Sequence, residues 1–398
     1  MPRLQTYRDR PVVLLTNDDG PPCASSPNIF SFCKLLQSRL GWDVRVVIPD
    51  TQKSWVGKAY AISDVISASY FYPLEPEGLT GEVTTRPRPL KEGETMEWVL
   101  LSGTPATCTN IALHNLYPGE IDLVVSGPNH GRNSSTAFAL SSGTLGAALA
   151  GALSTPIPGP SSGAASLHIE HIPCIAVSYG VVTRPVTARV MELATDAAVD
   201  VCERLSEDWG YDEDHEKGRH LVQVYSVNIP LVEGDLEKDR RQTAWTNMWR
   251  NAYGRLFKAT TLTQAEYDPG DNHNQQKSSS SSSPAENQPQ NNQIPPSAST
   301  TSTAGPGASP TPAPNKTTPS SPRTEPASDG QLRFHFAPDM RPLLSPPLDS
   351  LPVGSDAWAF AKGYISVTPL RAQFAGLIEG GYGFGSEEKE GKVAGSLW

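Results

Sequence analysis

Short apolar runs alternate with helix-like segments through about the first 230 residues, and this alternation limits the fold more than any other feature. The runs are rich in β-branched residues and bounded by turn residues, as expected of buried strands. They are Pro11–Leu15, Asp43–Ile48, Ile121–Val125, Ile172–Val177 and Leu221–Val227. Because strands that alternate with helices build parallel sheets covered on both faces, we predict an α/β fold with a Rossmann-like, doubly wound, mostly parallel sheet.

Two of the intervening segments carry clear helix signals. Ser26 is a plausible N-terminal cap, and Pro27 suits the first turn of a helix that ends at Gly41. Between Val190 and Leu205, apolar residues recur at spacings of three and four and mark one buried stripe. Both segments are therefore predicted to pack as helices on the sheet.

Residues 268–330 are mostly Ser, Pro, Thr, Asn and Gln and include the run Ser278–Ser283. With so few large apolar side chains the segment cannot offset its ordering entropy, so we predict that it is disordered. Its flanks, Tyr253–Ala259 and Leu332–Ala337, alternate apolar and polar residues and are predicted to form a β-hairpin extension whose tip the insert replaces. The predicted organisation is a core with the first hairpin strand (1–267), the insert (268–330), and C-terminal strands and tail completing the same domain (331–398).

Composition excludes several classes of protein. The 32 basic and 42 acidic side chains give a net charge of −10, which argues against a nucleic-acid polymer as the main ligand. No apolar run approaches the roughly 18 residues that span a bilayer, and the first residues lack the apolar core of a secretion signal. We therefore predict a soluble, cytoplasmic protein with no membrane partner. The five Cys are scattered without a C-x-x-C pair and are predicted to be buried thiols.

Polar residues gather where three of the predicted strands end. The loops are Thr16–Pro21, with two adjacent carboxylates, Pro49–Ser54, with a hydroxyl and a lysine, and Ser126–Asn133, with two amides. Since ligands of α/β sheets bind beyond the carboxyl ends of the strands, these loops are expected to meet. Carboxylate, hydroxyl and amide oxygens suit Mg²⁺, Mn²⁺ or Ca²⁺ better than zinc. His130 lies inside the third loop and could shuttle protons.

The segment Ser141–Gly151 reads as a helix of small residues that opens with hydroxyl groups. Small residues favour close packing on the sheet, and the N-terminus of a helix attracts anions. A metal beside an anion pocket indicates a phosphate-bearing ligand.

Five motifs in series resemble the signatures of the SurE family, the survival proteins, which are metal-dependent 5′/3′-nucleotidases and acid phosphatases. The motifs are Val13–Gly20, Pro49–Asp50 with Ser54, Ser102–Ala106, Ser126–Asn133 and Ser142–Thr144. Further on, Val227–Pro230, Gly354–Asp356 and Gly363–Leu370 resemble the family's C-terminal strands. The likeness covers the chain except the insert and the last residues, and Ser54–Lys58 looks most like the fungal acid-phosphatase branch.

The resemblance implies roles for particular residues. One divalent metal, Mg²⁺ or Mn²⁺, would be bound by Asp18, Asp19, Ser54 and Asn129. The phosphate would be bordered by Asn17, Asn133, Ser142, Gly143 and Thr144. Asp18 or Asp19 would be the catalytic carboxylate that handles the proton of an activated water.

These features predict a phosphomonoesterase that hydrolyses nucleoside monophosphates and other small phosphomonoesters. One alternative is a phosphatase that forms an aspartyl-phosphate on one Asp of the pair, although the Asp-x-Asp spacing typical of haloacid-dehalogenase-like enzymes is absent. The other is a non-catalytic, nucleotide-binding scaffold that presents the insert to partners. Intact oxygen ligands in all three loops favour an enzyme.

The resemblance also bears on assembly and specificity. The two hairpin strands and Gly363–Leu370 are predicted to project from a completed sheet and to need a second subunit as partner surface, so a homodimer or homotetramer is expected. The sequence departs from the family at Trp55, which replaces the small residue usual after the metal-binding serine. The insert departs too, because it occupies a hairpin that joins subunits in relatives.

Overall fold

A computed structural model describes residues 10–23, 26–157, 171–182, 184–214, 218–260 and 333–374. The predicted disordered insert lies outside these residues. Contacts divide the described chain into two compact units, one made of the residues up to 253 and from 340 onward, the other of those between 254 and 339. None of the described helices is both long and apolar enough to cross a membrane.

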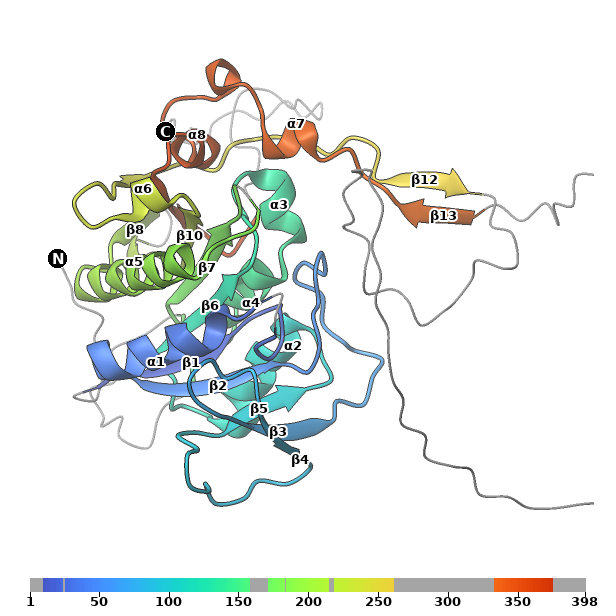
Figure 1. The fold of residues 1–398 in the computed structure, drawn as a ribbon, viewed down its shortest axis with the longest axis vertical. Coiled ribbons are helices and arrows are strands. Elements are labelled where there is room, and N and C mark those ends of the chain that lie inside the picture. The colour runs from blue at the N-terminus through green and yellow to red at the C-terminus, as the bar shows by residue number, and fades with distance from the viewer. Residues whose placement is uncertain are drawn as a thin grey trace, which may run out of the picture. The chain divides into compact units, whose positions relative to one another are not determined.

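The first unit is built on a ten-stranded sheet (Figure 1). Its strands are β1 (Val12–Thr16), β2 (Asp43–Pro49), β3 (Ala68–Pro73), β4 (Gly81–Thr84), β5 (Trp98–Leu101), β6 (Leu123–Asn129), β7 (Cys174–Gly180), β10 (Val224–Pro230), β11 (Thr243–Trp245) and β14 (Ile365–Leu370). They lie in the order β11-β14-β10-β7-β6-β1-β2-β5-β3-β4. All neighbours from β10 across to β5 are parallel, so the predicted doubly wound, mostly parallel sheet is confirmed. A separate small ribbon pairs β8 (Tyr211–Asp214) with β9 (Gly218–Leu221).

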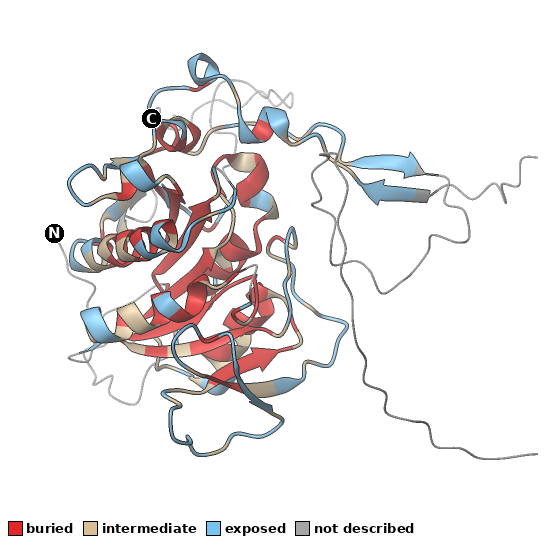
Figure 2. Cartoon of the chain, in the orientation of Figure 1, coloured by how far each residue is buried: buried red, intermediate tan, exposed pale blue. Residues whose placement is uncertain are grey.

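Helices cover both faces of this sheet (Figure 1). One face carries α1 (Asn28–Leu40) and α5 (Ala188–Glu207), and the other carries α2 (Pro105–Ile111), the π-helical turn η1 (Ala112–Leu116) and α4 (Gly143–Ala152). Within β1, Val13 and Leu15 join the core under α1 and α5, whereas Leu14 joins the opposite core. The central strands are accordingly buried on both sides (Figure 2), as their continuous apolar sequence requires.

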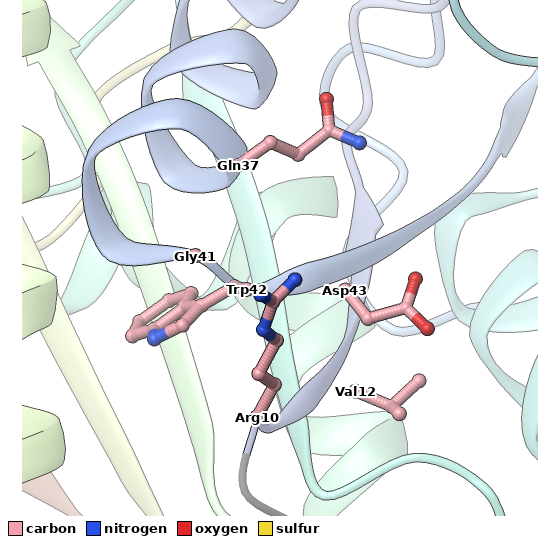
Figure 3. Close-up of a pocket in the computed structure, with 6 residues that line it drawn as sticks. All are labelled: Arg10, Val12, Gln37, Gly41, Trp42 and Asp43. Carbon is pink, nitrogen blue, oxygen red and sulfur yellow. The ribbon is translucent and has the colours of Figure 1, made fainter.

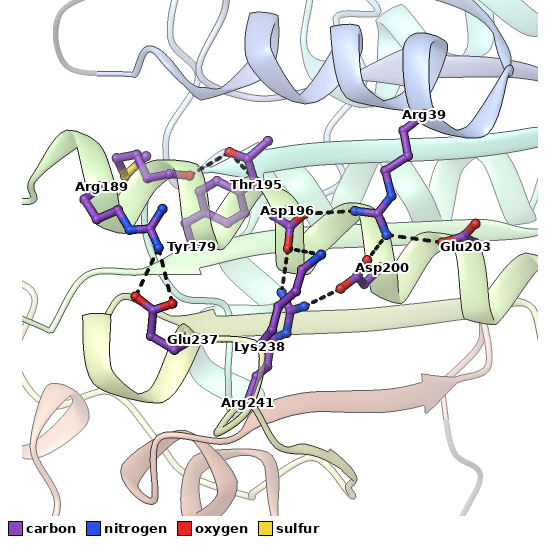
Figure 4. Close-up of polar contacts among 11 residues, drawn as sticks. Arg39, Tyr179, Arg189, Thr195, Asp196, Asp200, Glu203, Glu237, Lys238 and Arg241 are labelled. Carbon is purple, nitrogen blue, oxygen red and sulfur yellow. Dashed lines mark hydrogen bonds and ion pairs between the residues drawn. The ribbon is translucent and has the colours of Figure 1, made fainter.

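Shorter elements complete the unit. They are α3 (Thr136–Ser141), α6 (Glu233–Leu236), α7 (Arg341–Leu344), the 3₁₀ turn η2 (Leu348–Ser350) and α8 (Asp356–Ala361). Two arginines, Arg39 of α1 and Arg241, each contact both Asp196 and Asp200 on α5 (Figure 4). Because Asp196 and Asp200 form ion pairs with arginines from two different segments, the network holds α1 and the segment after α6 against α5.

The C-terminal strand corrects one prediction. β14 does not project from the core but pairs antiparallel with β10 and parallel with β11 of its own chain. The prediction was wrong because the sheet is not complete at β10, whose outer edge is still open. β14 pairs with this edge, in a register that places Val224 opposite Leu370 and Asn228 opposite Ser366. This segment therefore gives no reason to expect a second subunit.

The second unit contains the predicted hairpin pairing, which is confirmed. β12 (Phe257–Thr260) pairs antiparallel with β13 (Arg333–Phe336), with Phe257 opposite Phe336 and their ring centroids 5.6 Å apart. Both rings and Phe334 are largely exposed in the described chain.

Two local predictions are also corrected. The first helix begins at Asn28 rather than at Pro27, and Ser26 does not cap it; its Oγ instead donates to Asp19 Oδ2 at 3.0 Å. The second helix and the αL termination at Gly41 are confirmed. None of the five cysteines, all of which lie in the described chain, forms a disulfide, but Cys23 is exposed, so the expectation of buried thiols fails there.

Deleting residues 272–329 is expected to leave the thermal unfolding midpoint unchanged or slightly raised. The change shortens the connection between β12 and β13 about fivefold, which lowers its closure entropy by at most about 1.4 kcal/mol and removes no core-forming sequence. Circular dichroism melts of the full chain and the deletion variant provide the measurement. Aggregation, or a midpoint lowered by more than about 5 °C, would show that the segment is structural.

Candidate active site

The switch point of the sheet lies between β1 and β6. The chain runs from β1 outward to β2 and β5 on one side, then returns to β6, β7 and β10 on the other. Asn17, Asp18 and Asp19 directly follow β1, and Asn129 ends β6. Because these strands are parallel, their carboxyl ends share one edge of the sheet, which is where ligands of such sheets bind.

The loop after β2 reaches the same place. Lys53 donates its backbone N–H to the carbonyl of Asp18 at 2.7 Å, and Gln52 Nε2 donates to Asp19 Oδ1 at 3.2 Å. Ser54 is exposed and makes no hydrogen bond to Asp18 or Asp19 within the described chain. All three predicted loops therefore meet, although Ser54 stands at the rim.

Both carboxylates are buried: Asp18 is 5% exposed and Asp19 7%. Asp18 Oδ1 accepts from Thr144 Oγ1 at 2.7 Å, and Asp19 Oδ2 accepts from the backbone N–H of His130 at 2.9 Å as well as from Ser26. All of these donors are neutral. In the described part of the chain no Lys or Arg forms an ion pair with either carboxylate, so their charge is left without a cationic partner.

Burial, and after it the charge of Asp19, raises the pKa of Asp18 to about 7, while the Thr144 hydrogen bond acts in the opposite direction. Two adjacent buried carboxylates repel each other, and a proton or a bound cation relieves that repulsion. The carboxylate pair is therefore suited to bind a proton or a cation.

Asn17 acts within the turn that carries the pair. Its Nδ2 donates to the carbonyl of Gly20 at 2.8 Å and its Oδ1 accepts from the Gly20 N–H at 3.0 Å. Gly20 has a φ of +79°, which suits glycine. Asn17 therefore shapes the loop that presents Asp18 and Asp19.

The loop after β6 supplies Asn129 and His130. The register between β6 and β7 shifts between Ser126 and Asn129, which turns the end of the strand out of the regular ladder. Asn129 Nδ2 donates to the carbonyl of Gly131 at 2.9 Å, which fixes the orientation of its amide. Burial lowers the pKa of His130, against the opposing effect of Asp19, and its Nδ1 lies 3.4 Å from Asn28 Nδ2.

Asn133 connects the strands β7 and β10 to α4 and, through it, to Asp18. Its Nδ2 donates to Ser178 Oγ at 2.8 Å and to Thr144 Oγ1 at 3.3 Å, and its backbone N–H donates to Asn228 Oδ1 at 2.7 Å. Thr144 in turn donates to Asp18. The side chain of Asn133 thereby acts on the carboxylate through one intervening hydroxyl.

The start of α4 packs directly against Asp18. Ser142 caps the helix by accepting from the N–H of Leu145 at 3.1 Å. A Cβ on Gly143 would lie 2.7 Å from Asp18 Cβ and 3.0 Å from Asp18 Oδ2, so only glycine lets helix and carboxylate come this close. The N-terminus of this ten-residue helix, which favours anions, therefore lies next to the pair, with the backbone of Thr144 hydrogen-bonded to Asp18.

The C-terminal segment holds the loop after β6 in place. Asp356, at the first turn of α8, accepts from the backbone N–H of Ser135 at 2.6 Å and of Trp249 at 2.8 Å. Ser135 has a φ of +75°, an unfavourable value for a residue with a Cβ. Arg132 of the same loop donates to the carbonyl of Leu343 and lies over the ring of Phe360 at 5.0 Å.

Sequence reasoning missed several of these residues. Ser178 and Asn228 are polar residues inside otherwise apolar strands, and this break in the apolar pattern is visible in the sequence. Gln52 lies in the loop Pro49–Ser54, which was predicted to reach the site, but was given no role there, and Ser26 was interpreted as a helix cap. Asp356 ends the motif Gly354–Asp356, for which no role in the site was predicted. The missed set is Ser26, Gln52, Ser178, Asn228 and Asp356.

A cavity of about 600 Å³ lies elsewhere (Figure 3). It is lined by Arg10, Val12, Gln37, Gly41, Trp42 and Asp43. Val12 and Asp43 are the first residues of β1 and β2, so this cavity is at the amino ends of the strands, away from the carboxylate pair.

The arrangement defines a doubly wound α/β protein whose polar site sits at the switch point of its sheet. Within that class the chain belongs to the SurE family, because the family profile described as Survival protein SurE matches residues 13–255. This confirms the family resemblance of the sequence motifs.

Individual relatives carry different names. The chain is 35% identical over 258 residues to the probable tubulin–tyrosine ligase PBY1 of Saccharomyces cerevisiae, covering 60% of this chain and 31% of that protein, which is consistent with a fungal branch. It is 36% identical over 142 residues to the 5′-nucleotidase SurE of Christiangramia forsetii, covering 36% of this chain and 46% of that protein. The matches thus span less than half of these two relatives. The crystal structure of the SurE protein from Aquifex aeolicus aligns with a TM-score of 0.47 and 19% identity, over 92% of this chain and 95% of that one.

Proposed function

We propose that the chain is a metal-dependent phosphomonoesterase that hydrolyses nucleoside monophosphates and other small phosphomonoesters. The observation that carries this proposal is the buried pair Asp18 and Asp19 at the switch point, without a cationic partner in the described chain and in contact with the N-terminus of α4. The family membership and the nucleotidase name of the bacterial relative support it.

The donor set fits one divalent cation with hard-oxygen preference. Asp18, Asp19, Ser54 and Asn129 would hold it, with Mg²⁺ or Mn²⁺ as the natural candidates. Among the described residues no group of three or more His, Cys, Asp or Glu is placed to hold a metal ion, so the cation would rely on two carboxylates and neutral oxygens. When bound, it would neutralise charge on the phosphoryl group and acidify a water.

The remaining residues have defined tasks in this proposal. The N-terminus of α4, with Ser142, Gly143 and Thr144, would border the phosphate, and Ser142 caps that turn by accepting from the N–H of Leu145. Thr144 and Asn133 hold Asp18 in one orientation, so that Asp18 or Asp19 would take the proton of the attacking water.

A substrate panel tests the proposal. Phosphate release from 5′- and 3′-nucleoside monophosphates and from p-nitrophenyl phosphate would be measured with Mg²⁺, with Mn²⁺ and with a chelator. We expect release with a metal and none with the chelator. A protein that releases no phosphate with either cation, or equally with the chelator, would refute the proposal.

Replacing Asn129 by Ala should raise the metal concentration that gives half-maximal activity by about 10- to 100-fold, because a neutral oxygen ligand orients the cation. Asn129→Asp is the matched control: it keeps an oxygen at the metal but loses the Nδ2 donor to Gly131. If both variants shift the metal titration equally, the loop hydrogen bond is responsible; if neither does, Asn129 is not a ligand.

A further inference from the structure

Trp55 has an unusual backbone in the loop after β2. Its φ is +62°, and Ser135 is the other non-glycine residue with a positive φ in the described chain. A side chain with a Cβ pays an energetic cost in this region, so the surrounding contacts must enforce it. The large indole is nevertheless 39% exposed.

Backbone hydrogen bonds on both sides of Trp55 connect its loop to the segments that form the carboxylate site. Two residues earlier, the N–H of Lys53 donates to the carbonyl of Asp18 at 2.7 Å, and two residues later the N–H of Gly57 donates to the carbonyl of Ser141 at 3.0 Å. The next residue, Val56, also lies beside the site. A Cβ added to Gly143 would be 3.1 Å from Val56 Cγ1 and 3.0 Å from Asp18 Oδ2. The loop segment that carries Trp55 is thus held against the Asp18 site on both sides of the tryptophan.

Two further rings fix the direction of the indole. Its centroid lies 5.6 Å from that of Tyr253 at 41° and 6.4 Å from that of Phe138 at 71°. Tyr253 is itself anchored, because its hydroxyl is 2.6 Å from Ser141 Oγ. An aromatic ring held in one orientation loses little entropy when a ligand stacks on it.

We infer that Trp55 is a specificity-determining residue that stacks on the aromatic part of the leaving group of a phosphomonoester bound at Asp18 and Asp19. The inference rests on the proposed function and adds to it a preference: nucleobase or aryl leaving groups over small aliphatic ones. The loop that carries Trp55 is bound on one side to the backbone of Asp18, through Lys53, and on the other to Ser141, the residue before the Ser142 cap of α4, through Gly57. The indole therefore belongs to a loop that borders the site.

The test compares Trp55→Ala and Trp55→Phe with the wild-type enzyme on adenosine 5′-monophosphate and on glycerol 2-phosphate. Trp55→Ala should raise KM for the nucleotide about 10- to 100-fold with kcat nearly unchanged, and should leave KM for glycerol phosphate within about twofold. Trp55→Phe should recover most of the nucleotide KM. Trp245→Ala, which removes an exposed tryptophan from the edge strand β11, is the matched control and should change neither substrate.

If Trp55→Ala raises KM equally for both substrates, the role of Trp55 is structural. If KM changes for neither substrate, Trp55 is not part of the site, and each of these results overturns the inference. A wild-type protein that releases no phosphate from any substrate counts against the proposed function instead. In that case equilibrium binding of adenosine 5′-monophosphate decides: weaker binding by Trp55→Ala supports stacking, and equal binding overturns it.

Discussion

Asp18→Asn and Asp19→Asn should each lower kcat/KM for phosphomonoesters by at least about 100-fold while leaving the fold intact. Each change removes one charge from a buried pair that lacks a cationic partner in the described chain, so the affinity for a divalent cation falls. Relief of the repulsion between the carboxylates means that the thermal unfolding midpoint without metal should not fall.

Metal-induced stabilisation provides a readout that does not depend on turnover. Added Mg²⁺ or Mn²⁺ should raise the unfolding midpoint of the wild-type protein, because a ligand that binds the native state stabilises it, and this rise should vanish in both variants. Asp349→Asn, an exposed carboxylate in η2, serves as control and should keep both activity and the metal response. Wild-type behaviour of the two site variants would rule out the metal assignment.

Gly143→Ala should reduce activity by about 100-fold without unfolding the protein. The added Cβ would stand 2.7 Å from Asp18 Cβ, so either the carboxylate or the first turn of α4 must move, and displacements of about 1 Å in an active site can have effects of this size. Alanine is about 1 kcal/mol better than glycine inside a helix, so a lowered unfolding midpoint would report the steric contact and not helix propensity.

Gly234→Ala is the matched control for that change, since nothing lies within 4 Å of a Cβ at Gly234 in α6. It should retain full activity and the wild-type response to metal. If Gly143→Ala also behaves like wild type in both assays, α4 does not contact the reacting groups and the phosphate pocket must be elsewhere.

The sequence allowed the sheet and the meeting of the three loops to be predicted because both depend on local signals. Continuous β-branched runs mark strands buried on two faces, and parallel strands must bring the residues after their carboxyl ends together. That the loops carrying Asp18, Asp19 and Asn129 meet follows from these rules once the switch point is recognised, whereas the choice of Asn129 among the two amides of its loop came from the family resemblance.

The rest depends on contacts between distant segments. Ser26 has the sequence context of a helix cap, yet the helix begins at Asn28 with Pro27 in the cap position. Ser26 therefore lies one residue too early to cap it, and its hydroxyl donates to the charged Asp19 carboxylate. The pairing of β14 with β10 could not be anticipated, because an apolar strand pattern does not say which sheet edge is open. The exposed position of Ser54 likewise results from the turn conformation and not from its sequence spacing.

The anchoring of Ser135 by Asp356 has a consequence for biosynthesis. Asp356 and β14 both follow the second unit in the chain, whereas β10 and the loop after β6 precede it. A nascent chain that has emerged only as far as β13 therefore contains both carboxylates but leaves the edge of β10 unpaired and Ser135 unheld. At translation speeds of about 5–20 residues per second, this state lasts on the order of 10 s after β10 appears. During that interval the ribosome-bound protein has an open sheet edge that favours association with other strands, and the loop after β6 gains its hydrogen bond from Ser135 to Asp356 only once α8 has emerged.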